Sequence, residues 1–126
     1  MLSEAEIQTI ICTYNLEKAA HFYGNILGLR STTSAHGALV YIVKGGRLLV
    51  SPVPATKPSE HTVLGFCVAD LLAVIAKLKM QDIELEQFPH FAQDGERVLN
   101  LPGGDRVAWF RDPDGNLLSI VQYAQT

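Results

Sequence analysis

The chain lacks the features that mark several special classes of protein. Two cysteines in 126 residues are too few for a disulfide framework. No apolar run approaches the roughly 18 residues that a membrane-spanning helix needs. Lys and Arg never form a run, and the formal net charge is −3, so there is no basic surface for a phosphate backbone. We therefore predict neither a nucleic-acid partner nor a membrane partner.

We also expect no secretory leader. Residues 1–6 carry acidic side chains instead of the basic segment that opens a signal peptide. The two cysteines, Cys12 and Cys67, both lie in apolar runs, which is typical of reduced thiols inside a core. Both observations favour a cytoplasmic protein.

The composition that remains is that of one globular domain. Hydrophobic residues make up 48% of the chain and charged residues 18%. A chain of this length buries enough apolar surface for one core. We predict a single domain over residues 1–126, with a first module at about 5–53, a proline-containing linker at 54–60 and a second module at about 61–124.

The first half predicts a strand, a helix and three further strands. Residues 6–13 are rich in β-branched side chains, which favours a strand. Asn15 suits a helix N-cap. Apolar residues then recur at helical spacing over residues 16–27, and Gly28 suits the left-handed position that ends a helix. Strands are predicted at residues 30–35, 38–43 and 47–53, with the tight-turn sequence Lys44-Gly45-Gly46 before the last of them.

The same order returns in the second half. Residues 62–68 predict an apolar strand, Asp70 suits an N-cap, and residues 71–78 have the apolar spacing of a helix. Asp112-Pro113-Asp114-Gly115 predicts a hairpin turn, because proline presets φ and glycine accepts a positive φ. Strands are predicted at residues 83–87, 106–111 and 116–123, and residues 96–101 could form a short extra strand within the long segment 88–105.

The chain is therefore an internal repeat of the order β-α-β-β-β. The two predicted N-caps, Asn15 and Asp70, lie 55 residues apart. A unit of one helix and one sheet leaves an apolar sheet face to cover, so two copies are expected to pack on each other. This order predicts an α+β fold built from tandem βαβββ modules.

Three motifs carry a resemblance to a known family. The first is the segment 15–29, with Asn15-Leu16, Phe22-Tyr23 and Leu27-Gly28 at fixed spacing. The others are Val68-Ala69-Asp70-Leu71 and Phe110-Arg111-Asp112-Pro113-Asp114-Gly115-Asn116. In this order the chain resembles the vicinal oxygen chelate superfamily of glyoxalases, bleomycin-resistance proteins and dioxygenases, and the resemblance covers almost the whole chain. It implies a glyoxalase-like fold, in which the two modules form a curled, mostly antiparallel sheet around a cavity, and it implies a homodimer.

The resemblance also implies four metal-ligand positions, most of which lack a ligand in this chain. Gln8 takes the first position, and its amide oxygen is a plausible hard ligand. The equivalent position of the second half is Val63, which cannot ligate. Ser119 stands where the family has its final Glu, and Leu49 or Ser51 stands where it has the Glu of the first half.

We therefore predict no bound metal and no other cofactor. Divalent ions need anionic or imidazole donors to offset dehydration, and these positions offer one amide and hydroxyl groups. His61 lies two residues before Val63 and would share its strand face. A metal site rebuilt around His61 is thus an alternative, although a solvated histidine at a strand start is favoured. Glyoxalase I, extradiol dioxygenase and thiol-transfer activities all need the metal, so these substitutions count against them.

The remaining site candidates are polar or aromatic. If Gln8, Ser51 and Ser119 line the cavity, their neutral groups suit a neutral, partly apolar ligand; otherwise they satisfy one another in a closed cavity. Trp109 either packs in the core or stacks on a planar ligand. Arg106 is predicted to point to the opposite face from Trp109, because three positions separate them on one strand.

Two further side chains leave alternatives open. Arg106 either binds an anion in the cavity or pairs with Asp105 or Asp112 at the surface, and the pairing is favoured. His90 is either a lid residue over the cavity or part of a mobile surface loop, and the loop is favoured. These choices leave Gln8, Ser51, Arg106, Trp109 and Ser119 as the predicted ligand-binding residues.

The favoured hypothesis is a glyoxalase/bleomycin-resistance-like protein that binds a small, neutral or partly apolar molecule in the sheet cavity without a metal. One alternative is a metal-dependent lyase, isomerase or dioxygenase of the same superfamily with atypical ligands. Another is a non-catalytic interaction module. The sequence identifies no catalytic residue and leaves open whether the protein is an enzyme.

Overall fold

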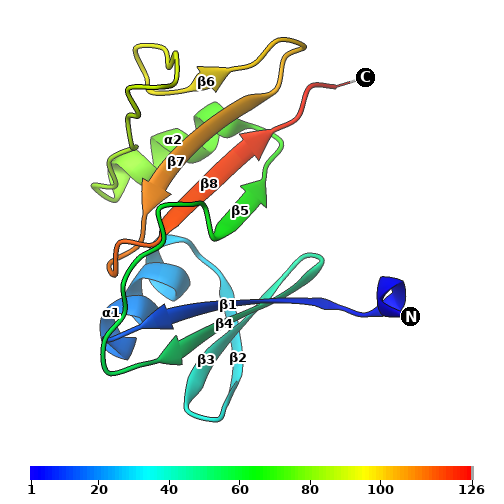
Figure 1. Ribbon diagram of the computed structural model, residues 1–126, viewed down its shortest axis with the longest axis vertical. Coiled ribbons are helices and arrows are strands. Elements are labelled where there is room, and N and C mark those ends of the chain that lie inside the picture. Colours follow the sequence, from blue (N-terminus) through cyan, green and yellow to red (C-terminus); the bar gives the residue numbers. More distant parts are fainter. Residues whose placement is uncertain (126) are drawn as a thin grey trace. The chain divides into compact units, whose positions relative to one another are not determined.

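The computed structural model describes residues 1–125, apart from the side chains of residues 33–35. The chain divides into two compact units, one over Met1–Pro58 and one from Ser59 onward. This boundary falls inside the segment 54–60 that the sequence marks as a linker. Each unit contains one four-stranded sheet with a helical segment on one face (Figure 1).

The first unit has the predicted order of elements. They are a 3-10 turn η1 (Leu2–Glu4), β1 (Ile7–Thr13), α1 (Leu16–Ala20), the π-helix η2 (His21–Ile26), β2 (Arg30–Ala35), β3 (Ala38–Val43) and β4 (Gly46–Pro52). The strands lie in the order β1-β4-β3-β2. Only β1 and β4 are parallel among these neighbours, and the other two pairs are antiparallel.

The helix of the first unit begins and ends where the sequence predicts. The Asn15 side chain accepts a hydrogen bond from the Lys18 amide at 3.1 Å, which satisfies a free helix N–H group. From His21 the segment widens into a π-helix, in which the Leu27 amide donates to the Phe22 carbonyl at 2.9 Å. Gly28 then adopts a φ of +73° and ends it. The sequence predicted a single regular helix, so the change of hydrogen-bond period is a difference.

The second unit repeats the first strand for strand. Its elements are β5 (Leu64–Cys67), α2 (Leu71–Met80), β6 (Leu99–Asn100), β7 (Arg106–Arg111) and β8 (Leu117–Gln122). The strand order is β5-β8-β7-β6, with β5 and β8 parallel and the other pairs antiparallel. Asp70 caps α2 by accepting from the Ala73 amide at 3.1 Å. The predicted α+β fold with tandem βαβββ modules is confirmed.

The predicted strand at residues 83–87 is wrong. The segment runs beside β7, and the Glu86 amide donates to the Trp109 carbonyl at 2.8 Å. However, the neighbouring backbone groups, the Glu86 carbonyl and the Phe88 amide, are bound by the side chain of Gln93 instead of a strand. The edge strand of this sheet is β6, which lies inside the short strand predicted at residues 96–101.

Both cysteines were predicted to be buried in the core, and neither is fully buried. Cys12 is half-buried and Cys67 is exposed. Cys67 lies at the end of β5, an edge strand, where its side chain alternates away from the buried side of the sheet. No helix among the described residues is long and apolar enough to cross a membrane.

Candidate ligand-binding site

The sheet of the second unit has one face covered by α2 and one face open. The Leu71 amide at the start of α2 donates to the Gln122 side-chain oxygen at 2.8 Å, so Gln122 lies on the helix side of β8. Leu118 and Ile120 share that side and are buried. Ser119 therefore lies on the open face, and so does its cross-strand partner Trp109.

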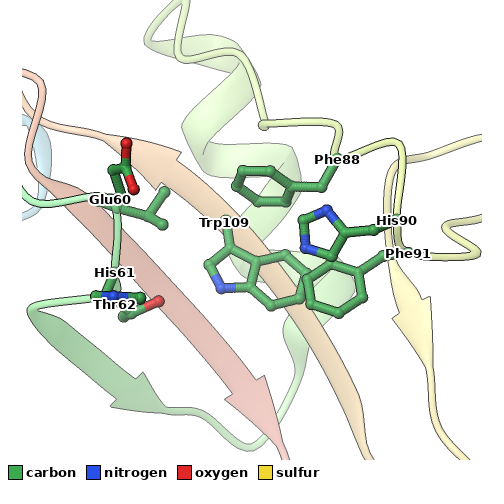
Figure 2. Close-up of a pocket in the computed structure, with 8 residues that line it drawn as sticks. Glu60, His61, Thr62, Phe88, His90, Phe91 and Trp109 are labelled. Atoms are coloured by element: carbon green, nitrogen blue, oxygen red, sulfur yellow. The ribbon is translucent and has the colours of Figure 1, made fainter.

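A cavity of about 230 Å³ lies over this open face. It is lined by Glu60, His61, Thr62, Phe88, His90, Phe91, Trp109 and Leu117. All of these residues belong to the second unit. The cavity has two unlike sides, since the segment 60–62 is polar and the other side is built mostly of aromatic rings (Figure 2).

Four rings form the aromatic side of the cavity. Phe91 lies flat on Trp109, with ring centroids 5.0 Å apart and planes inclined by 4°. Phe88 meets the same indole edge-on, with centroids 5.4 Å apart and planes at 86°. His90 packs against Phe91 at 4.3 Å between ring centroids. Aromatic pairs of these geometries each contribute about 0.5–1.5 kcal/mol beyond their buried area.

The sequence Phe88-Pro89-His90-Phe91 holds three of these rings at one turn. The turn is closed by the Phe91 amide, which donates to the Phe88 carbonyl at 3.1 Å. Phe88 is half-buried, whereas Phe91 keeps 37% of its surface exposed. Phe88 is therefore held in the cavity wall, whereas Phe91 faces both the Trp109 indole and solvent.

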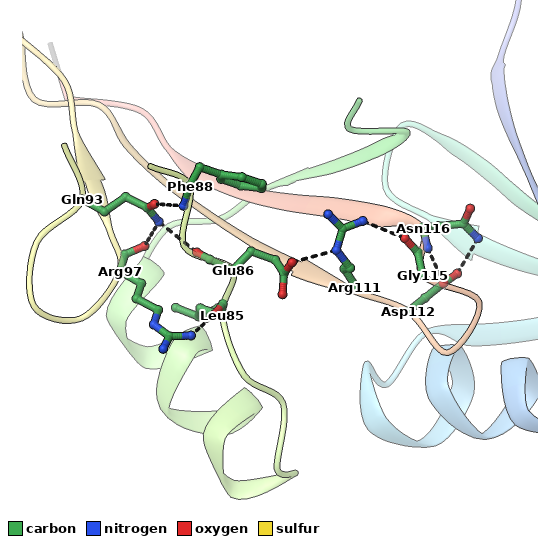
Figure 3. Close-up of polar contacts among 9 residues, drawn as sticks. All are labelled: Leu85, Glu86, Phe88, Gln93, Arg97, Arg111, Asp112, Gly115 and Asn116. Carbon is green, nitrogen blue, oxygen red and sulfur yellow. Dashed lines mark hydrogen bonds and ion pairs between the residues drawn. The ribbon is translucent and has the colours of Figure 1, made fainter. Parts of the chain in front are cut away.

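Gln93 holds the base of this turn with all of its amide atoms. Its oxygen accepts from the Phe88 amide at 2.7 Å, and its nitrogen donates to the Glu86 carbonyl at 2.9 Å and the Arg97 carbonyl at 2.8 Å (Figure 3). One side chain therefore satisfies three backbone groups that a strand ladder would otherwise pair. Arg97 also donates to the Leu85 carbonyl at 2.6 Å.

A second polar network joins the segment before the turn to the β7–β8 hairpin. The Arg111 guanidinium contacts the Glu86 carboxylate at 2.7 Å and the Gly115 carbonyl at 2.9 Å (Figure 3). The buried Asp112 carboxylate accepts from the Asp114 amide and from both the amide and the side chain of Asn116, at 2.8–3.0 Å. Gly115 completes the predicted turn with a φ of +89°.

The structure separates the predicted ligand-binding residues of the second unit. Trp109 lines the cavity, and Ser119 is its cross-strand neighbour on the open face. Ser119 has room there because Gly65, its partner on β5, has no side chain; a Cβ on Gly65 would lie 2.9 Å from the Ser119 oxygen. Arg106 lies on the opposite face of β7 and donates to the Asn100 side-chain oxygen at 3.2 Å.

The predicted partners of Arg106 are occupied elsewhere, so the pairing with Asp105 or Asp112 is wrong. Asp105 accepts from the Ala124 amide at 2.7 Å, and Asp112 is committed to its own turn. The acid near Arg106 is instead Asp94. Hydrogen bonds from the Val98 amide, the Glu96 amide and the Asn100 side chain, together with the charge of Arg106, outweigh desolvation and hold the pKa of Asp94 below its ordinary value.

In the first unit, Gln8 and Ser51 share the sheet face that points away from α1. Tyr41 marks the helix side, because its ring packs on Tyr23 with centroids 6.2 Å apart. The register pairs Gln8 with Arg47 and Ser51 with Cys12 on adjacent strands. Gln8 and Ser51 are therefore offset by four positions along the strands, and they do not meet directly.

Two of the positions at which the family resemblance implies metal ligands carry no anionic or imidazole donor. Val63 contributes no donor atom, and Ser119 offers a neutral hydroxyl group. Within residues 1–125, no group of three or more His, Cys, Asp or Glu side chains is arranged to hold a metal ion. His61 is exposed and lines the cavity.

Sequence reasoning missed Phe88, Phe91 and Gln93. The available signal was the density of rings in Phe88-Pro89-His90-Phe91, because three aromatic side chains within four residues of a loop need a surface to pack on. His90 was predicted to belong to a mobile surface loop, and the structure places its ring at the cavity. Gln93 had no signal, since its role depends on backbone groups that are brought together only by the fold.

A family model matches residues 7–120, and its description is the Glyoxalase/Bleomycin resistance protein/Dioxygenase superfamily. The chain belongs to this superfamily. The match begins in β1 and ends within β8, and it includes all five predicted ligand-binding residues. No curated protein matches this superfamily member in sequence.

Solved structures share the fold at low sequence identity. A protein assigned to the glyoxalase family from Bacillus anthracis has a TM-score of 0.77 at 15% identity, with 96% of each chain covered. A glyoxalase/bleomycin resistance protein/dioxygenase from Alicyclobacillus acidocaldarius has a TM-score of 0.70 at 16% identity, covering 97% of this chain and 93% of its own. A lactoylglutathione lyase from Agrobacterium tumefaciens has a TM-score of 0.71 at 18% identity, covering 94% and 93%. Identities this low speak for the fold alone.

Proposed function

We propose that this superfamily member binds a small, neutral or partly apolar molecule, without a metal ion, in the cavity over β7 and β8. The observation that carries the proposal is the division of the cavity into an aromatic side and a polar side. Ligand sites are typically apolar concavities with a few polar groups that fix orientation. Here the rings of Phe88, Phe91 and Trp109 supply the apolar surface, and Glu60, His61 and Thr62 supply the polar groups.

The donor chemistry supports a site without metal. Superfamily chemistry that relies on a divalent ion needs anionic or imidazole donors at the ligand positions, and Val63 and Ser119 provide neither. Metal-dependent lyase, isomerase or dioxygenase activity is therefore the second candidate. The observation in its favour is that two imidazoles, His61 and His90, line the same cavity.

The test combines ligand screening with metal titration of the full chain. A library of small neutral aromatic and aliphatic compounds is screened by thermal shift, because a compound that binds only the folded state at about 100 times its Kd raises the free energy of unfolding by about 2.7 kcal/mol. Trp109→Leu should abolish the shifts while keeping apolar bulk. Tyr123→Ala, which removes an exposed ring away from the cavity, should leave them unchanged.

Two results would contradict the proposal. The first is a library in which no compound shifts the wild-type protein, or in which the shifts survive Trp109→Leu. The second is tight binding of Zn, Ni, Mn or Fe, well below roughly millimolar, measured by calorimetry. That second result, together with loss of the metal in His61→Ala, would favour the metal-dependent candidate.

A further inference from the structure

One face of the Trp109 indole is already occupied by a ring of the same chain. Phe91 lies parallel to the indole, with planes inclined by only 4° and centroids 5.0 Å apart (Figure 2). Phe88 contacts the indole at 86°, so its ring does not stack on the indole. Phe91 therefore takes up the position in which a flat aromatic molecule would stack on Trp109.

The two phenylalanines differ in how firmly they are held. Phe88 is half-buried, and its amide is bound by Gln93 at 2.7 Å, so the backbone at the base of the turn is fixed. Phe91 lies at the far end of the turn with 37% of its surface exposed. Rotation about the side-chain bonds of Phe91 would take the ring off the indole, and off Phe88 and His90, without breaking the hydrogen bonds of Gln93.

The cavity is small for a ligand site while the Phe91 ring lies in it, which agrees with displacement of that ring on binding. With Phe91 in place the cavity measures about 230 Å³. Sites for drug-sized ligands usually measure about 300–1,000 Å³. Departure of the Phe91 ring would enlarge the cavity and expose the flat face of the indole within it.

We infer that Phe91 is a gate: its ring covers the Trp109 indole until the ligand displaces it. We infer also that the ligand is a planar, uncharged aromatic molecule. The ligand displaces the Phe91 ring, stacks on Trp109, meets the edge of Phe88 and directs a polar substituent towards the segment 60–62. This inference rests on the proposed function, because it specifies the ligand class and the entry step of the same cavity.

The test uses a flat probe and a saturated probe of the same skeleton. 2-Naphthol and decahydro-2-naphthol are titrated by calorimetry into the full-length wild type, Phe91→Ala and Tyr123→Ala. Removal of the gate ends the competition for the indole face, so Phe91→Ala should bind 2-naphthol about 2- to 10-fold tighter than wild type. Tyr123→Ala should match wild type, and 2-naphthol should bind tighter than its saturated counterpart to every variant.

Trp109 gives a readout that is specific for the site, because it is the only tryptophan in the chain. In a ¹⁵N-labelled sample its indole N–H gives one side-chain resonance of its kind. That resonance should shift with Phe91→Ala alone and again with 2-naphthol. Phe91→Leu, which keeps apolar bulk but cannot stack, is the second variant if the alanine variant is unstable, and its affinity should lie between the other two.

The outcomes separate the gate from the function it rests on. If wild type binds 2-naphthol and Phe91→Ala binds it equally or more weakly, Phe91 is a wall of the site and the gate is wrong. If the saturated probe binds as well as the flat one, the ligand class is wrong. If neither wild type nor the gate variants bind either probe, the proposed function fails along with the inference.

Discussion

The two units share one strand order but differ in how the chain travels from the helix to the sheet. In the first unit the helical segment ends at Ile26 and β2 begins at Arg30. In the second unit α2 ends at Met80 and the two-residue strand β6 begins only at Leu99. The added chain in the second unit holds the aromatic turn 88–91 and Gln93. The strand order that the two units share therefore supplies the sheet face, and the segment found only in the second unit supplies the aromatic wall of the cavity.

The largest expected effect concerns the two β-hairpins that end the units. Asp112→Ala removes the carboxylate that accepts three hydrogen bonds inside the β7–β8 turn and leaves buried donors without it. We expect the free energy of unfolding to fall by about 3 kcal/mol. The matched change in the first unit, Lys44→Ala, alters an exposed turn residue and should cost less than about 0.5 kcal/mol. Urea denaturation measures both, and equal losses would show that the two turns contribute alike.

The next comparison is between two strand glycines. A Cβ on Gly46 would overlap the Ile7 carbonyl oxygen, which is backbone of the paired strand and cannot move aside. We expect Gly46→Ala to destabilise by about 2 kcal/mol. Gly65→Ala instead meets the Ser119 side chain and should cost about 1 kcal/mol. The double change with Ser119→Ala should recover most of that loss in denaturant unfolding, whereas an unrecovered loss would mean that Gly65 is needed for another reason.

The irregular segment of the second unit gives the third prediction. Gln93→Leu deletes the side-chain bonds to the Phe88 amide and to two carbonyls, and we expect a loss of about 1.5 kcal/mol. The effect should be local, so hydrogen exchange at the Phe88 amide should accelerate more than exchange within β8. If hydrogen exchange accelerates equally throughout the second unit, Gln93 instead contributes to the global stability of that unit.

The smallest expected effect is a pH dependence confined to the second unit. Hydrogen bonding, led by the Val98 amide, lowers the pKa of the exposed Asp94 from its ordinary 3.8. A group with a lowered pKa contributes stability that is fully present above its unfolded pKa and is lost as the pH falls through the folded value. Asp94→Asn should therefore flatten part of the stability loss below about pH 3.8 in acid unfolding curves. If the curves of the two proteins have the same slope, Asp94 does not contribute to the loss of stability at low pH.

Local patterns were enough to predict the repeat. The N-caps Asn15 and Asp70 and the glycine-containing turns follow from contacts between near neighbours in sequence, and each formed as predicted. The strand prediction for residues 83–87 failed because an apolar pattern cannot reveal a distant side chain. The amide of Gln93 bonds the Glu86 carbonyl in place of a neighbouring strand. For the same reason Trp109 could be assigned to a sheet face, but its partner Phe91, 18 positions away, could not be named.

The parallel strand pair of each unit has a consequence for synthesis. Ile7 pairs with Gly46, 39 residues later, and Leu64 pairs with Leu118, 54 residues later. The antiparallel hairpins β3–β4 and β7–β8 close through short turns and can form early. At about 5–20 residues per second on the ribosome, β1 waits roughly 2–8 s for its partner and β5 roughly 3–11 s. The first strand of each unit is thus the first to be made and the last to be paired, so a nascent chain carries an open edge for seconds.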